Sequence, residues 1–206
     1  TAFGTPTSLK NWALAGMQFE TASGTQKNFV RIFEQMGISG DEDWFDKNPQ
    51  HSFTKMRDLC DRKLKNTVGF NTTCSIRKIY IELQRVPYGL RCVPYSALVL
   101  GFVLKGWLTK KPPLQWTNGQ ITKRLDADTL AEIIESVVKD DGANKIKDEK
   151  LICRLSKEEK AFVEQSSEMF GITGSNPDGT VEAALEIVQR RIEQVSGRVP
   201  LWVLPD

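Results

Sequence analysis

The sequence contains few of the residues from which catalytic and metal sites are built. Among 206 residues there is one histidine, His51, and there are four cysteines, Cys60, Cys74, Cys92 and Cys153. No two cysteines form a C-x-x-C pair, so we expect no zinc site. Three of the four lie in apolar or helical patterns, where a reduced, buried thiol is the usual state. This usage of cysteine predicts a cytoplasmic protein.

Long apolar runs and nucleotide-binding loops are also lacking. The longest apolar run, Ala97 to Leu104, is far shorter than the roughly 20 residues that a membrane-spanning helix needs. We therefore expect no membrane partner. Neither G-x-x-x-x-G-K-[ST] nor G-x-G-x-x-G occurs, so the chain has no phosphate-binding loop of these kinds, and we expect no cofactor. No basic and apolar leader opens the chain, which argues against secretion.

The two ends predict that the chain is part of a longer protein. It begins with Thr1 rather than methionine, and it ends on the apolar run Val199 to Pro205. Such a strand-like terminus normally pairs with another segment. We therefore expect the remainder of a parent chain as one partner.

Acidic residues are scarce in the middle of the chain. Residues 53–124 hold fourteen Lys and Arg but three Asp and Glu, a net charge of +11, whereas residues 1–52 carry −2 and residues 125–206 carry −7. The fourteen are Lys55, Arg57, Arg62, Lys63, Lys65, Arg77, Lys78, Arg85, Arg91, Lys105, Lys110, Lys111, Lys123 and Arg124. Either the acidic C-terminal block or a polyanion such as DNA or RNA could neutralise them. Charge alone does not choose between the two.

The sequence pattern predicts a mainly α fold with a small β-hairpin (α+β). Helices are expected over residues 26–36, 52–66, 73–84, 95–105, 126–139, 156–170 and 180–195. Residues 1–24, apart from a short apolar patch at Trp12 to Phe19, and the acidic loop 40–46 are expected to be irregular. Residues 95–105 are apolar nearly all round, which predicts a buried helix at the centre of the core.

Caps and turns refine this prediction. Ser52 is expected to cap the second helix, and Ser156 with Glu159 forms a capping box. Asn118-Gly119 predicts a hairpin between strands 115–117 and 120–122. Residues 151–155 are expected to form a short strand. The last helix is expected to bury the apolar residues Val181, Leu185, Val188 and Ile192.

We divide the chain into three segments by composition. Residues 1–52 form an N-terminal helical and irregular segment, residues 53–140 a basic winged-helix-like core, and residues 141–206 an acidic C-terminal helical segment. The three can also form one compact domain. The order of three helices and a hairpin in the middle segment is that of a winged-helix-like helical bundle, in which the third helix enters the major groove.

That third helix, residues 95–105, lacks the exposed polar face that reading base edges requires. Any nucleic acid is therefore expected to be held through its backbone. The candidate contacts are Arg57, Arg62, Lys63, Lys110, Lys111, Trp116, Lys123 and Arg124. Trp116 has two interpretations: it stacks on a sugar or base, or it packs across the hairpin strands.

No constellation of residues indicates an active site. His51 lies in a polar stretch with no acidic partner fixed beside it, and the acidic run Asp41 to Asp46 is typical of a solvated loop. Glu132 and Glu135 share a helix face, whereas Glu158 and Glu159 stand near a helix start, where the helix dipole favours them. We therefore expect a protein that is not itself an enzyme.

A short stretch resembles a known family. Residues 86–91, Val-Pro-Tyr-Gly-Leu-Arg, precede the apolar helix directly, and this pattern resembles the winged-helix-like segment of large bacterial P-loop ATPases of phage defence, including BREX-type systems. The Pro-Leu-Trp segment at residues 200–202 is similar to one in the same proteins. The resemblance implies an accessory segment of such an ATPase, involved in DNA contact or assembly. ATP hydrolysis is not implied, because the nucleotide-binding motifs are lacking.

Three hypotheses follow. The first is a non-catalytic module of a larger, ATP-driven bacterial protein that contacts nucleic acid, most simply DNA. The second is a protein-interaction or scaffolding module, whose basic block is neutralised by its own acidic helices or by a partner protein. The third, a self-contained enzyme, would need a pocket that holds His51 beside several carboxylates.

Overall fold

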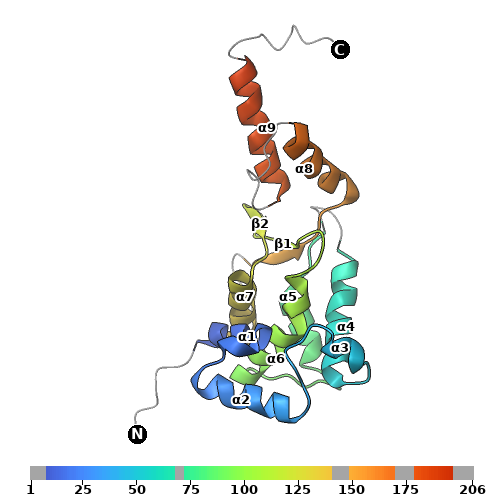
Figure 1. Cartoon of the computed structure of the whole chain (residues 1–206), viewed down its shortest axis with the longest axis vertical. Helices are drawn as coiled ribbons and strands as arrows, with labels where there is room; N and C mark the ends of the chain where they lie inside the picture. Colours follow the sequence, from blue (N-terminus) through green and yellow to red (C-terminus); the bar gives the residue numbers. More distant parts are fainter. Residues whose placement is uncertain (1–7, 68–71, 141–148, 170–178, 197–206) are drawn as a thin grey trace.

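The computed structural model describes residues 8–67, 72–140, 149–169 and 179–196. These residues are mainly helical, with a small antiparallel sheet, so the predicted mainly α fold with a small β component is confirmed (Figure 1). The helices are α1 (Leu9–Met17), α2 (Gly24–Gln35), α3 (Trp44–Lys47), α4 (Ser52–Lys65), α5 (Ile76–Leu83), α6 (Pro94–Leu104), α7 (Ala127–Lys139), α8 (Lys157–Met169) and α9 (Val181–Ser196). The strands are β1 (Gln115–Thr117), β2 (Thr122–Arg124) and β3 (Leu151–Cys153), and Phe19–Thr21 and Lys105–Trp107 form single 3₁₀ turns.

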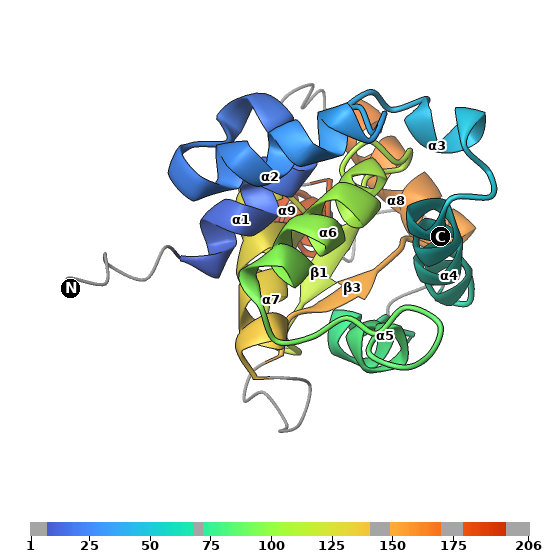
Figure 2. The ribbon, with the colours of Figure 1, turned by 90° about the horizontal axis from the view of Figure 1, so that it is seen from below.

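Helix α6 is the central element of the core, as its sequence predicts. Every residue from Ser96 to Leu104 is buried. Seen from below, α6 runs through the middle of the molecule, with α1, α2, α4, α5 and α7 around it (Figure 2). A helix without a polar face can be stable in water only when neighbours cover all its sides. These helices supply that cover.

Helix α1 corrects the expectation that residues 1–24 are irregular. Ser8 caps it, because its hydroxyl accepts a hydrogen bond from the N–H of Lys10 at 3.3 Å. The helix lies across α6 so closely that a β-carbon added at Gly16 would stand 2.0 Å from the carbonyl oxygen of Leu98. Its buried side includes the small residues Ala13, Ala15 and Gly16. Small side chains give a weak apolar periodicity, which hides such a helix in the sequence.

The sheet joins the middle of the chain to its C-terminal part. Its order is β2-β1-β3, and both pairings are antiparallel. Cys74, just before α5, extends it through two backbone hydrogen bonds with Ile152 of 2.7 and 2.8 Å. The predicted hairpin is confirmed, but its second strand begins two residues later than expected, at Thr122. The Asn118 side chain accepts from the N–H groups of Gln120 and Ile121, both at 3.0 Å, which holds residues 118–121 as the loop.

The segment before α4 differs from the prediction in two places. Trp44 and Phe45, expected in an irregular acidic loop, are buried and begin α3. His51 rather than Ser52 caps α4, since its Nδ1 accepts from the N–H of Phe53 at 3.1 Å. Its ring lies 4.9 Å from that of Trp44, edge to face. The His51 ring also lies 5.0 Å from the Phe53 ring, edge to face. Packing against the Trp44 and Phe53 rings therefore holds the imidazole at the N-cap position of α4.

Helices α8 and α9 pack on each other and stand beyond the sheet (Figure 1). The capping box is confirmed, because Ser156 Oγ accepts from the N–H of Glu159 at 3.1 Å and a carboxylate oxygen of Glu159 accepts from the N–H of Ser156 at 2.5 Å. The expected burial of α9 is wrong: Val181 and Val188 are half-buried, Leu185 is 45% exposed and Ile192 is 42% exposed. The exposure begins at Leu185, in the second turn, and so is not confined to the far end of the helix.

One apolar core extends from Trp12 in α1 to Ile152 in β3. The expected N-terminal segment (1–52) and basic segment (53–140) therefore share a core. The apolar run 199–205 and most of the loop expected at 171–179 lie outside the described residues. None of the helices in the described ranges is both long and apolar enough to cross a bilayer.

Candidate nucleic-acid interface

Helix α4 provides the best-defined basic surface. Its inner face buries Phe53, Met56, Cys60 and Leu64 in the core. The spacing of 3.6 residues per turn then places Lys55, Arg62 and Lys65 on the outward side, and all three are exposed. Arg62 is the one member of this trio among the predicted contacts. The helical periodicity from Arg62 could have identified the other two.

Besides Arg77, which has a contact of its own, four of the fourteen cations of residues 53–124 have close partners. Arg57 pairs with Asp46 at 3.2 Å and Asp58 at 3.4 Å, and its guanidinium lies over the Phe45 ring at 4.8 Å. Lys63 pairs with Glu82 at 2.6 Å. These two predicted contacts are thus already engaged locally.

Lys110 and Lys105 are the other two cations with close partners. Lys110 pairs with Asp61 at 3.2 Å. Lys105 is buried and donates to the carbonyl oxygens of Gly40 at 2.7 Å and Asp41 at 3.1 Å. Burial lowers the pKa of Lys105, although the nearby carboxylates oppose that shift. All three acidic residues of the block are therefore used by cations of the same block.

Nine further cations are exposed and form no ion pair within the described part of the chain. They are Lys55, Arg62, Lys65, Lys78, Arg85, Arg91, Lys111, Lys123 and Arg124. Arg77 is half-buried, has a contact of its own and is not among these nine. Exposed like charges that lack counterions repel one another and attract polyanions.

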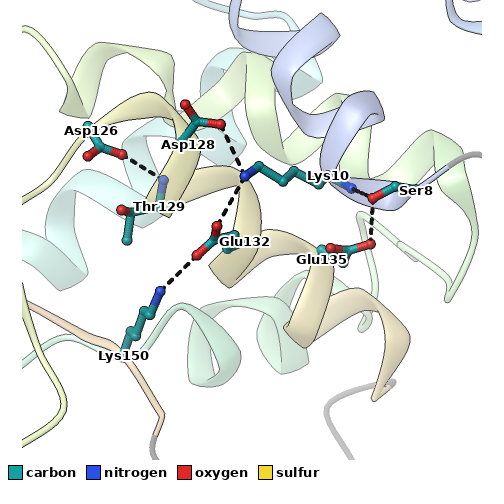
Figure 3. A network of polar contacts seen from close by, with 8 residues as sticks. All are labelled: Ser8, Lys10, Asp126, Asp128, Thr129, Glu132, Glu135 and Lys150. Atoms are coloured by element: carbon teal, nitrogen blue, oxygen red, sulfur yellow. Dashed lines mark hydrogen bonds and ion pairs between the residues drawn. The ribbon is translucent and has the colours of Figure 1, made fainter.

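The acidic C-terminal block finds its partners elsewhere. Lys10 of α1 pairs with Asp128 at 3.1 Å and with Glu132 at 3.0 Å, and Lys150 reaches the other oxygen of Glu132 at 2.8 Å (Figure 3). Hydrogen bonds from Lys150 and Lys10 lower the pKa of Glu132. The carboxylate of Glu135 accepts from the Ser8 hydroxyl at 2.8 Å. Among the described residues, no carboxylate of residues 126–193 forms an ion pair with the four paired cations or with the nine exposed ones.

The predicted contacts do not form one continuous surface. Lys110 lies beside α4, because its ion-pair partner Asp61 belongs to that helix. Asp61 also accepts a hydrogen bond from the indole N–H of Trp107 at 2.9 Å. Lys123 and Arg124 lie on β2, whereas β3 at the other edge of the sheet pairs with Cys74 beside α5. Consecutive strand residues point to opposite faces, so these two cations diverge as well.

Trp116 is 7% exposed, and its ring faces the Lys150 ammonium at 4.8 Å. It pairs with Lys123 on one side and Ile152 on the other. This is the packing interpretation of the residue, because a ring so covered offers no face on which a base could stack.

The remaining chemical candidates are dispersed. His51 is engaged as a helix cap, and burial lowers its pKa. Within the described ranges, no three residues among His, Cys, Asp and Glu gather as ligands for a metal ion. Lys78, which lines a pocket with Lys63, is a residue that the sequence analysis missed as a candidate contact.

Comparison of the chain with protein-family models, with curated proteins and with solved structures finds no match.

Proposed function

We propose that this chain is a non-catalytic module that binds nucleic acid, most simply duplex DNA, through the phosphate backbone. The observation that carries the proposal is the set of nine exposed cations that lack ion-pair partners in the described structure. Each Lys or Arg that meets a phosphate releases a condensed counterion, which is favourable at low salt. The outward face of α4, with Lys55, Arg62 and Lys65, is the central contact.

A winged-helix-like arrangement is part of the proposal. The order α4, α5, α6 and the β1–β2 hairpin supports it, as does the short antiparallel sheet that the hairpin forms with β3. The burial of α6 supports contact with the backbone rather than with base edges, because a buried helix cannot enter the major groove. In keeping with the resemblance to phage-defence ATPases, the module would serve a larger, ATP-driven protein in the cytoplasm.

Binding of labelled duplex DNA over a series of salt concentrations tests the proposal. We expect the logarithm of the affinity to fall linearly with the logarithm of salt concentration. Replacing Lys55, Arg62 and Lys65 together by Gln should lower the slope by up to about 3, since each phosphate contact contributes about 0.9. The proposal would be contradicted if the chain did not bind DNA at low salt, or if its affinity did not change with salt concentration.

A matched control separates local contact from total charge. Lys27 and Arg31 on α2 and Lys157 on α8 are exposed, and they lie outside the basic block. Their joint replacement by Gln removes the same number of charges. We expect this control to retain most of the affinity and slope, whereas equal losses in both triple variants would refute α4 as the contact surface.

A protein-interaction module is the second candidate. The exposed apolar residues Leu185 and Ile192 on α9 and Met169 on α8 favour it, since such side chains are often covered by a partner. Light scattering over a range of concentrations, together with the DNA titration, discriminates the two. Self-association without DNA binding would favour the interaction module.

A further inference from the structure

A polar pocket of about 510 Å³ lies between the end of α4 and the start of α5. Its lining includes Lys63 and Lys78, the hydroxyl residues Thr67, Thr73 and Ser75, and the carboxylate of Glu82. The volume lies within the range of small-molecule sites, which is roughly 300–1,000 Å³. Its polar lining suits a charged ligand rather than an apolar one.

Lys63 and Lys78 make the pocket electropositive, and their charges act as far as Cys74 in its lining. Lys63 and Lys78 both act electrostatically to lower the pKa of the Cys74 thiol, against the burial that raises it overall to about 11. Lys78 is exposed and has no side-chain partner among the described residues. Its ammonium is therefore available to an incoming anion.

The carboxylate of Glu82 competes with an anionic ligand for Lys63. Its carboxylate holds Lys63 at 2.6 Å, so the charge of that lysine is balanced while no ligand is present. A ligand with two negative charges would displace this contact, because Lys63 and Lys78 could then share it. A singly charged ligand would gain less from the exchange.

The polar groups around the lysines complete a set of donors. Ser75 is already engaged, since its hydroxyl donates to Glu149 at 2.5 Å and accepts from the N–H of Lys78 at 3.2 Å. Thr73 is exposed at the pocket, and its hydroxyl forms no hydrogen bond with another residue that the structure describes. The Thr67 hydroxyl is engaged too, since it donates to the carbonyl oxygen of Lys63 at 3.4 Å. The ammonium groups, with the Thr73 hydroxyl beside them, suit the oxygens of a phosphate group.

We propose that this pocket binds a phosphate monoester, held by Lys78 and Lys63, with Glu82 as the competing anion. The proposal does not depend on the proposed function, because a free nucleotide or the 5′-phosphate of a nucleic-acid strand would supply the same chemistry. The pocket volume leaves room for a group attached to the phosphate.

Calorimetric titration of the full chain at low ionic strength provides the test, with AMP, adenosine and inorganic phosphate as probes. We expect AMP and phosphate to bind and adenosine not to bind. Lys78→Gln should weaken AMP at least about tenfold, which corresponds to the loss of a hydrogen bond to a charged group. Glu82→Gln should tighten AMP about threefold, as the removal of a weak surface ion pair allows.

The opposite signs of these two effects separate binding from misfolding, because a damaged fold would not bind more tightly. Lys27→Gln is the matched control, since Lys27 is an exposed lysine on α2 that does not line the pocket. Its affinity for AMP should equal that of the parent chain. Equal binding of adenosine and AMP, an unchanged Lys78→Gln variant, or weaker binding by Glu82→Gln would each overturn the proposal.

Competition then identifies the source of the phosphate. A duplex with a 5′-phosphate and the same duplex with a 5′-hydroxyl are titrated against bound AMP. Displacement by the phosphorylated duplex alone would assign the pocket to strand ends, and displacement by neither would assign it to a free phosphate ester. Displacement by both alike would show that an internal phosphodiester suffices, which would refute the preference for a monoester.

Discussion

Gly16 and Gly101 lie at the crossing of α1 and α6, where each helix presses its backbone against the other. A β-carbon on Gly16 would stand 2.0 Å from the Leu98 carbonyl oxygen, and one on Gly101 would stand 2.1 Å from that of Ala13. Real β-carbons do not approach other atoms so closely. The two glycines therefore set the distance between the helices.

Alanine at either position should destabilise the fold strongly. The clash is with backbone, which no change of rotamer relieves, so we expect Gly16→Ala and Gly101→Ala each to cost about 1–3 kcal/mol or more. Urea unfolding followed by tryptophan fluorescence measures the effect. Gly106→Ala is the control, because its β-carbon would meet nothing within 4 Å and Gly106 is exposed. Equal stability of all three variants would contradict the packing at the crossing.

One thiol of the four should react quickly. Cys60, Cys74 and Cys153 are buried, and burial raises the pKa of each, to about 11 for Cys74 and for Cys153. Cys92 is the exposed cysteine. Because the thiolate is the reacting form, a chromogenic disulfide reagent near pH 8 should titrate one equivalent at once and the other three after denaturation.

The variant Cys92→Ser should lose the rapid equivalent and keep the slow ones. A second fast thiol in the parent chain would show that one of the three buried cysteines opens readily to solvent.

His51 should make part of the stability depend on pH. Burial lowers its pKa in the folded chain, and its Nδ1 must be unprotonated to accept from Phe53. The unfolded chain then binds the proton more readily. The contribution is therefore complete above the ordinary pKa of about 6.5, and it is lost as the pH falls below that value towards the lower folded pKa.

Urea midpoints at pH 7.5 and pH 5.5 test this expectation. In His51→Asn the amide oxygen can still cap α4 but does not titrate, so its midpoint should fall less between the two pH values than that of the parent chain. Equal falls would show that other groups account for the dependence.

Glu132 should add a second dependence at lower pH. Its folded pKa is lowered by Lys150 and Lys10, so the stabilisation is present above the ordinary carboxyl pKa and is lost as the pH falls through the lowered one. Between pH 7 and pH 3, Glu132→Gln should therefore lose less stability than the parent chain. Glu34→Gln is a suitable control, because Glu34 is exposed on α2 and forms no ion pair among the described residues. An identical response of both variants would contradict the network in Figure 3.

The sequence predicted best where the pattern is strong and local. Helix α6 is apolar on all sides, so the core was the one place where its sequence could be stable. Asn118-Gly119 identified the hairpin. The loop length was wrong because the Asn118 side chain, rather than the backbone alone, organises the turn. Helix α1 was missed because small residues, Ala13, Ala15 and Gly16, separate its two large buried side chains, Trp12 and Met17, and weaken the apolar period.

For the candidate interface, the sequence supplied the excess of positive charge but not its distribution in space. Which cations are neutralised depends on tertiary neighbours: Asp61 meets Lys110 across 49 residues of sequence. Trp116 could not be assigned from strand alternation, since both alternatives fit an aromatic residue in a hairpin. The approach of Lys150 to its ring is likewise a tertiary contact.

The packing of α1 on α6 also has a consequence for how the chain folds. Gly16 is made 85 residues before Gly101, so during synthesis α1 leaves the ribosome long before its docking surface exists. Contacts so distant in sequence form late, since a long loop must close before they contribute. Until α1 arrives, α6 exposes an apolar flank. A chain in which α1 has not yet docked on α6 therefore exposes apolar surface that the native fold buries.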